Sequence, residues 1–207
     1  VLLMTATPIP RTLMLAAYGD LDESQLRDKP AGRKAVVTST ASIDRLEDAA
    51  NGVRRQIDSG GKVFWVCPLV EESETIDVAA ATARHAALQQ RFGDRVGLVH
   101  GKMTGKEKDA VMARFAGKAE PGLDILVATT VIEVGVDVPD ATVMIIEHSE
   151  RFGLAQLHQL RGRIGRGSRD ATCLLLYGHD AGKTARERLR VLRDTDDGFE
   201  IAEQDLR

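Results

Sequence analysis

Arginines alternate with glycines in the stretch 152–167, which reads FGLAQLHQLRGRIGRG. The arginines are Arg161, Arg163 and Arg166. An arginine carries a fixed positive charge and a planar fork of donors that matches phosphate oxygens. Glycine weakens a helix by about 1 kcal/mol relative to alanine, so we expect Gly162 and Gly165 to let the backbone approach something closely. The stretch therefore predicts phosphate recognition.

Three more stretches carry polar side chains directly after a predicted strand. They are Thr5-Ala6-Thr7-Pro8, His100-Gly101-Lys102 and the segment from Ala128 to Pro139. In an open parallel sheet, ligands bind at the carboxyl ends of the strands. We therefore expect these stretches and the arginines to meet in one site, although each stretch taken alone is also an ordinary turn.

Two of these stretches offer donors to an anion. His100 and Gly101 precede a helix that begins with capping-box spacing at Thr104, and the free N–H groups of a helix N-terminus favour a phosphate. In the other stretch, two threonines could donate hydrogen bonds to a phosphate backbone. A glycine after them allows the turn that presents an aspartate, which could accept hydrogen bonds from a ribose hydroxyl or an arginine. Those residues are Thr129, Thr130, Gly135 and Asp137.

The segment GHDAGKT at 178–184 imitates a nucleotide-binding P-loop, because it follows a strand and precedes a helix. A P-loop has four residues between its glycines, whereas Gly178 and Gly182 enclose only His179, Asp180 and Ala181. The cradle of N–H groups would then not close. A self-sufficient P-loop NTPase is thus a disfavoured alternative.

The elements that must position these residues alternate between short apolar runs and helical patterns. This alternation predicts an α/β fold in which a parallel sheet has helices on both faces. The predicted strands are Ala35–Ser39, Val63–Cys67, Val96–His100, Asp124–Ala128, Val143–Glu147 and Ala171–Tyr177. The predicted helices cover 43–57, 76–92, 105–115, 154–160 and 184–194.

Composition adds a few limits. The formal net charge is −3, which gives no hint of a nucleic-acid partner, but positive charge is concentrated between Glu150 and Arg193. Cys67 and Cys173 lie in apolar runs, so we expect buried free thiols in a reducing cytosol and no metal site. No run approaches the length of a membrane span and no signal peptide is evident, which predicts a cytoplasmic protein.

The motifs resemble those of superfamily 2 helicases. Motifs III, V and VI are matched in order by Thr5–Pro8, Thr129–Asp137 and Gln159–Arg166. The longer strings MTATPIPRTL, VCPLVEESE, LVHGKM, ATTVIEVGVDVP and ERFGLAQLHQLRGRIGRG are similar to ATP-dependent DNA helicases that remodel stalled forks and Holliday junctions. The alternatives are a transcription-repair coupling translocase and a nucleic-acid-binding module without catalysis.

This resemblance implies roles for individual residues. Arg163 and Arg166 would reach the triphosphate, with Gln159 opening their motif. Gly135 and Asp137 would face the nucleotide. The DNA-binding group would be Thr129, Thr130, His100 and Gly101, and the residues that couple nucleotide state to DNA grip would be Thr5 and Thr7.

The resemblance also implies how the chain is divided. Residues 1–19 would end a first RecA-like helicase domain, 20–34 would be a linker, and 35–182 would form the second RecA-like domain. Residues 183–207 would begin a translocation hairpin that is truncated here. The chain opens in mid-strand, as a fragment would. ATP and Mg²⁺ would bind mainly to the missing first domain, so we expect this fragment of a monomeric branched-DNA enzyme to be inactive alone.

Overall fold

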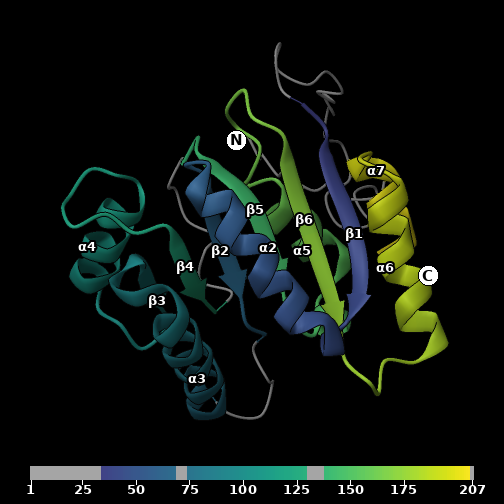
Figure 1. Cartoon of the computed structure of the whole chain (residues 1–207). Helices are drawn as coiled ribbons and strands as arrows, with labels where there is room; N and C mark the ends of the chain where they lie inside the picture. Colours follow the sequence, from purple (N-terminus) through teal and green to yellow (C-terminus); the bar gives the residue numbers. More distant parts are fainter. Residues whose placement is uncertain (1–33, 69–73, 130–137, 206–207) are drawn as a thin grey trace, which may run out of the picture.

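Six parallel strands form one sheet, in the order β1-β6-β5-β2-β4-β3 (Figure 1). The computed structural model describes residues 34–68, 74–129 and 138–205. The strands are β1 (Val36–Ser42), β2 (Lys62–Val66), β3 (Val96–Val99), β4 (Ile125–Ala128), β5 (Ala141–Ile146) and β6 (Ala171–Tyr177). Each of the six strands predicted from apolar runs is present, with ends that differ by a few residues at most.

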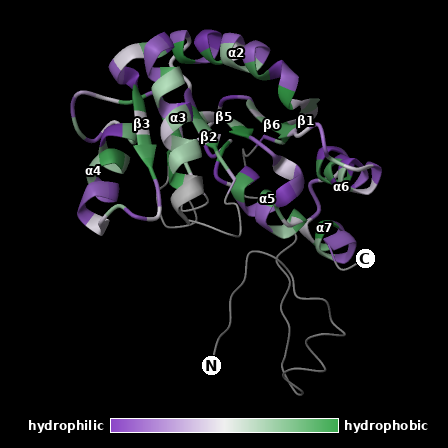
Figure 2. Cartoon of the chain, turned by 90° about the horizontal axis from the view of Figure 1, so that it is seen from below, coloured by the Kyte–Doolittle hydropathy of each residue, from purple (hydrophilic) through white to green (hydrophobic). Residues whose placement is uncertain are grey.

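Helices cover both faces of this sheet. One face carries α2 (Leu46–Asp58) and α3 (Glu74–Phe92). The other carries α4 (Gly105–Phe115), α5 (Leu154–Arg161), α6 (Lys183–Asp194) and α7 (Gly198–Asp205). Short 3₁₀ turns are η1 (Ile43–Arg45), η2 (Gly93–Arg95) and η4 (Ser149–Arg151). The apolar sides of the helices face the strands in Figure 2.

Alternation along each strand explains why both faces need a cover. In β2, Phe64 and Val66 point into the core beneath α4 and α5, whereas Val63 and Trp65 point into the core beneath α2 and α3. Burying one such side chain contributes about 1.5–3 kcal/mol. The predicted two-faced parallel sheet is therefore confirmed.

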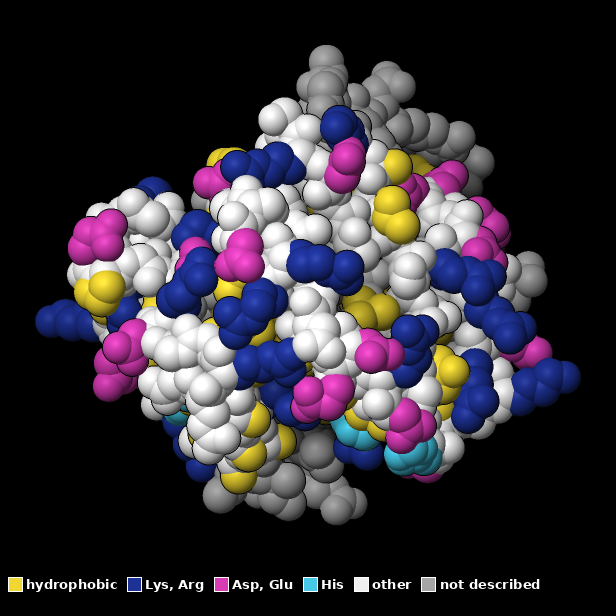
Figure 3. Space-filling model, in the orientation of Figure 1, with side chains coloured by type: hydrophobic (Ala, Val, Ile, Leu, Met, Phe, Trp, Pro, Cys, Tyr) yellow, Lys and Arg dark blue, Asp and Glu magenta, His cyan; other side chains and the backbone are white. Residues whose placement is uncertain are grey.

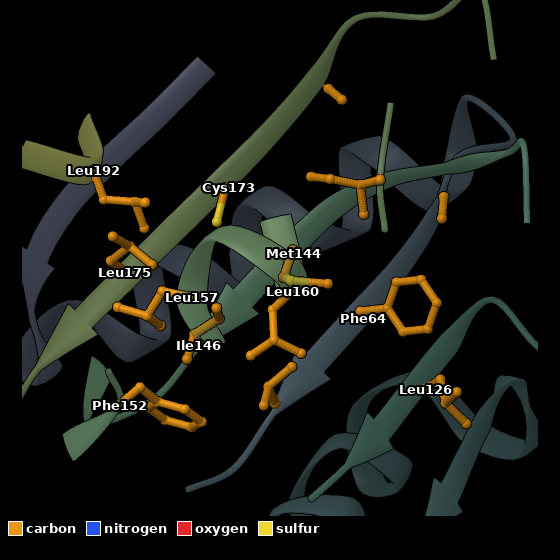
Figure 4. Close-up of a cluster of buried hydrophobic side chains, with 14 of the residues drawn as sticks. Phe64, Leu126, Met144, Ile146, Phe152, Leu157, Leu160, Cys173, Leu175 and Leu192 are labelled. Carbon is orange, nitrogen blue, oxygen red and sulfur yellow. The ribbon is translucent and has the colours of Figure 1, made fainter. Parts of the chain in front are cut away.

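The helix that leads to Arg163 and Arg166 is fixed by its apolar face. Leu154, Leu157 and Leu160 are buried, as their spacing predicts. Figure 4 shows Leu157 and Leu160 directed into the cluster that also holds Met144 and Phe64. This packing holds α5 against the sheet and sets where the chain leaves it.

Both cysteines are buried and free, as predicted. Burial raises the pKa of the Cys173 thiol to about 12, so it stays protonated at neutral pH. Within 34–68, 74–129 and 138–205, no group of His, Cys, Asp or Glu side chains has metal-site geometry. In the same ranges, no helix is both long and apolar enough to cross a membrane.

The last two helices belong to the same core as the sheet. Leu189 and Leu192 of α6 and Ile201 of α7 lie in the cluster under α5. The domain boundary that we predict after residue 182 stays a prediction, as do the boundaries in the segment before β1, which lies outside the described residues.

Candidate functional site

The candidate residues lie at two opposite edges of the sheet. His100 and Thr129 directly follow β3 and β4, so they lie at the carboxyl edge. The arginines follow α5, which runs back toward the strand starts. The Gly165 amide donates to the carbonyl of Ala141, the first residue of β5, at 3.1 Å. The expectation that all the motifs meet at the carboxyl ends is therefore wrong for the arginines.

Close contacts with the rest of the chain explain the glycines of the arginine segment. Gly165 has φ +66°, and a Cβ there would lie 3.1 Å from side-chain atoms of Ala171 and Val36. A Cβ on Gly167 would lie 2.7 Å from the carbonyl oxygen of Pro139, which is too close. These glycines thus let the segment approach the sheet rather than a ligand.

Arg163 and Arg166 follow α5 on the segment that reaches the amino edge. Arg163 is half-buried and its amide donates to the Leu160 carbonyl at 2.9 Å. Arg166 is exposed and its Nε donates to the Gly162 carbonyl at 3.2 Å. Gln159, on the last turn of α5, is half-buried. These three residues therefore lie close together in the sequence, at the end of α5 and directly after it.

Arg161 has a different role from the one its sequence neighbours suggest. Its side chain is buried, and its Nη1 donates to the carbonyls of Leu192 at 2.6 Å and Thr195 at 3.2 Å. Its Nη2 lies 3.2 Å from the Asp196 carboxylate. Burial lowers the pKa of the guanidinium, and Asp196 opposes that shift. Arg161 therefore closes the end of α6 and does not grip a phosphate.

The other end of α5 is capped by a distant carboxylate. Asp205 accepts hydrogen bonds from the Leu154 amide at 2.9 Å and the Ala155 amide at 3.1 Å. Arg188 lies 3.0 Å from the same carboxylate. Burial alone would raise the pKa of Asp205, but these amides and Arg188 together hold it below its usual value. The segment after β6 thus fixes α5 at both ends.

At the carboxyl edge, two buried polar atoms lie on neighbouring strand ends. Val99 is the register partner of Ala128, so His100 and Thr129 come one residue later on adjacent strands. His100 Nδ1 and Thr129 Oγ1 are buried and have no hydrogen-bond partner among the described residues. Buried polar atoms are nearly always satisfied, which makes this pair a good place for a ligand oxygen.

The start of α4 beside them already holds a negative charge. The Glu107 carboxylate accepts from the Thr104 amide at 2.7 Å and from its hydroxyl at 2.8 Å, which completes the predicted capping box. These hydrogen bonds lower the pKa of Glu107. Because a carboxylate occupies this helix end, Thr129 and His100 are the stronger candidates for an anion contact.

A buried ion pair that the sequence did not suggest lies at the end of β5. The Glu147 carboxylate accepts hydrogen bonds from the Trp65 indole N–H and from Arg84 of α3. Arg84 also lies over the Trp65 ring, with 5.7 Å from guanidinium carbon to centroid. Sixty-three residues separate Arg84 from Glu147, so no local motif signals the pair.

The P-loop imitation is surrounded by carboxylates. Glu150 accepts from the Gly178 amide at 3.1 Å, and Asp180 Oδ1 lies 2.7 Å from where a Cβ on Gly178 would stand. The Lys183 side chain is 91% exposed and lies 3.8 Å from Glu187. Negative groups at the turn disfavour a phosphate there, which argues against the self-sufficient NTPase.

The remaining predicted site residues lie outside the described residues. They are Thr5, Thr7, Thr130, Gly135 and Asp137. Their roles stay predictions. Pro139, which closely follows Asp137 in the chain, is described and lies against Gly167 at the amino edge.

Comparison with known families decides what kind of domain this is. The family model described as helicase conserved C-terminal domain matches residues 41–168. The chain belongs to this family. This helicase domain shares 52% identity with the ATP-dependent DNA helicase RecG of Acidithiobacillus ferridurans, over 99% of the chain and 30% of the relative. RecG of Escherichia coli K12 is 53% identical over 99% of the chain and 29% of the relative.

Solved structures agree with this assignment. A RecG structure bound to a three-way DNA junction matches 97% of the helicase domain chain and 26% of its own chain, with 49% identity and a TM-score of 0.81. The Saccharomyces cerevisiae protein Dbp5 matches 98% of the chain and 54% of its own, with 14% identity and a TM-score of 0.64. The RecA-like fold is thus confirmed, and the chain spans under a third of the RecG relatives' length.

Proposed function

We propose that this chain is the second motor domain of an ATP-dependent DNA helicase that remodels branched DNA, such as stalled forks and Holliday junctions. The observation that carries the proposal is 52% identity to a RecG helicase over 99% of the chain. The junction bound by the similar RecG structure supports branched DNA as the substrate. Relatives at this level of identity that name RecG favour RecG over the transcription-repair coupling translocase.

Arg163 and Arg166 would act on the nucleotide from the amino edge. Phosphoryl transfer to water develops charge on the transferred phosphate. An arginine from a second domain stabilises this charge and can raise the rate of hydrolysis by ~10³ or more. Arg166 is the better candidate for this finger, because it is exposed on a segment that close packing holds in place. Gln159 would orient the neighbouring polar groups, and Gly135 with Asp137 would complete the nucleotide face.

The nucleotide itself requires a partner domain. The described residues hold no closed phosphate cradle, and the turn at Gly178 is acidic. ATP and Mg²⁺ would therefore be held mainly by a first RecA-like domain, of which Thr5 and Thr7 would be the coupling remnant. When bound, they supply the phosphate to be transferred and the charge that neutralises it. We expect a monomeric, cytoplasmic enzyme.

DNA would bind at the opposite edge, through Thr129 and Thr130 with His100 and Gly101. Hydroxyl and amide donors to phosphate position a protein on DNA without reading its sequence. The Thr129 hydroxyl and the His100 nitrogen, which have no hydrogen-bond partner in the described part of the chain, support contact at this place. Nucleotide and DNA would then meet opposite edges of one rigid sheet, so closure onto the nucleotide would move the DNA contacts as a unit.

The test is ATP hydrolysis by the full-length protein with Arg166→Ala and Arg163→Ala. We expect Arg166→Ala to lower hydrolysis by ~10³ while DNA binding is retained. Arg169→Ala is the matched control, because Arg169 lies just beyond the same segment and donates to the Ser59 carbonyl at 3.3 Å. It should retain most of the activity.

Two outcomes would count against the proposal. Unchanged hydrolysis in both Arg163 and Arg166 variants would remove the arginine-finger assignment. Salt-sensitive DNA binding without any nucleotide hydrolysis by the wild-type full-length protein would instead favour a binding module without catalysis.

A further inference from the structure

A stripe of basic side chains runs along the exposed side of α6. It consists of Lys183, Arg186, Arg190 and Arg193, which are all exposed. At 3.6 residues per turn, the spacing of three, four and three residues keeps them on one side of the helix. In Figure 3, Lys and Arg side chains form a row down the right side of the molecule, where α6 lies in Figure 1.

The opposite side of α6 explains why this stripe faces outward. Leu189 and Leu192 are buried in the core, and Arg188 turns away to pair with Asp205. The helix is therefore anchored through its apolar side. The basic side is available without any change in the fold.

The acidic groups on α6 offset only part of the charge. Glu187 lies 3.8 Å from Lys183, and Asp194 lies 2.7 Å from Arg193. Both pairs are largely exposed and so contribute little. Arg186 is held in position, since its guanidinium lies 4.9 Å from the Tyr177 ring centroid and its Nε donates to Ala181. A held, partly uncompensated row of cations is suited to an anionic rod.

We propose that this α6 stripe binds the phosphate backbone of duplex DNA, away from the carboxyl-edge site. From Lys183 to Arg193 the helix rises about 15 Å, at 1.5 Å per residue. Phosphates of one strand of a duplex recur every ~3.4 Å along its axis, so the stripe spans about four such steps. The arginine fork suits phosphate oxygens.

The position of the α6 stripe relative to the carboxyl edge suits a branched DNA substrate. α6 packs on β1, whereas Thr129 follows β4, and four strand spacings of about 4.8 Å place them roughly 19 Å apart across the sheet. One arm of a junction could therefore lie on the stripe while another strand occupies the carboxyl edge. This inference rests on the proposed function, because it assumes that the full protein binds DNA.

The experiment measures the affinity of the full-length protein for a labelled duplex without a junction, over a series of salt concentrations. The variant is Arg186→Gln with Arg190→Gln, which keeps helix propensity and removes two charges. We expect the slope of log K against log salt to become shallower by about 2, since each lost phosphate contact removes about 0.9. Arg190→Gln alone should remove about half of this.

The matched control is Arg55→Gln with Lys118→Gln, which removes the same charge from exposed positions on α2 and after α4. It should keep the wild-type slope. A stripe variant with the wild-type slope would overturn the proposal. An equal decrease in slope for duplex and for single-stranded DNA would also overturn it. If an acidic segment of the same protein covers the stripe, the variant will melt earlier with its slope unchanged, which also overturns it.

The wild-type protein separates this inference from the proposed function. Wild-type protein that binds neither a junction nor a duplex at low salt would remove the DNA-binding role altogether. Wild-type binding with equal slopes in both variant pairs would remove only the α6 contact.

Discussion

The carboxyl and amino edges of the sheet are built in different ways. At the carboxyl edge, single polar side chains arrive from separate strand ends, such as His100 after β3 and Thr129 after β4. At the amino edge, one continuous segment carries Arg163 and Arg166 and is held by Gly165 and Gly167 against the sheet. A site assembled from many loops can change one contact at a time, whereas a site on one fixed segment moves or fails as a whole.

The largest expected effect on stability concerns the arginine that is buried behind this segment. Arg161→Ala would remove the donor of the Leu192 and Thr195 carbonyls and the positive charge beside Asp196. We expect the free energy of unfolding to fall by about 2–4 kcal/mol, measured by urea titration. Arg166→Ala, which removes an exposed arginine five residues away, should change it by under ~0.5 kcal/mol. Equal losses in the two variants would erase the distinction between a structural and a functional arginine.

A smaller effect is expected at the capped start of α5, the helix that leads to the arginine segment. Asp205→Asn should lower the free energy of unfolding by about 1 kcal/mol at neutral pH, as for a lost helix cap. The folded-state pKa of Asp205 is below its ordinary value of 3.8, so the carboxylate stabilises the fold above that pH. The difference between wild type and variant should therefore shrink as the pH falls below about 4. A difference that is constant from pH 7 to 3 would show that charge is not what stabilises the cap.

The smallest effect on stability, with a visible effect on binding, is expected at the carboxyl edge. Thr129→Val removes a buried hydroxyl that has no partner among the described residues, so the free energy of unfolding should stay within ~0.5 kcal/mol. DNA affinity of the full-length protein should fall several-fold. Thr142→Val is the control, because Thr142 is buried at the amino edge and its hydroxyl donates to Gln56 at 3.5 Å. If Thr142→Val weakened DNA binding as much, the DNA contact could not be assigned to the carboxyl edge.

Local chemistry explains why much of the fold could be predicted from the sequence. Apolar runs such as 63–67 identify strands that are buried on both faces. The Thr104 and Glu107 pair identifies a helix start, because both partners lie within one turn. The spacing of Leu154, Leu157 and Leu160 identifies the buried side of α5. In each case the residues that interact are neighbours in the chain.

The site was less predictable because its geometry depends on distant parts of the chain. The rule that ligands bind at carboxyl ends applies to loops that follow strands, whereas the arginines follow a helix that has returned to the other edge. Arg161 did carry a signal, since it continues the buried spacing of Leu154 and Leu157. The Asp205 cap gave none, because fifty-one residues separate it from Leu154.

The buried indole at the end of β2 gives this domain an optical reporter of its own. The sequence contains a single tryptophan, Trp65, so its fluorescence arises from one known place. Its N–H donates to Glu147, and Arg84 lies over its ring, beneath the carboxyl edge. Emission from this one fluorophore will therefore follow unfolding of the sheet centre, and any rearrangement of that ion pair when a ligand arrives, without an added dye.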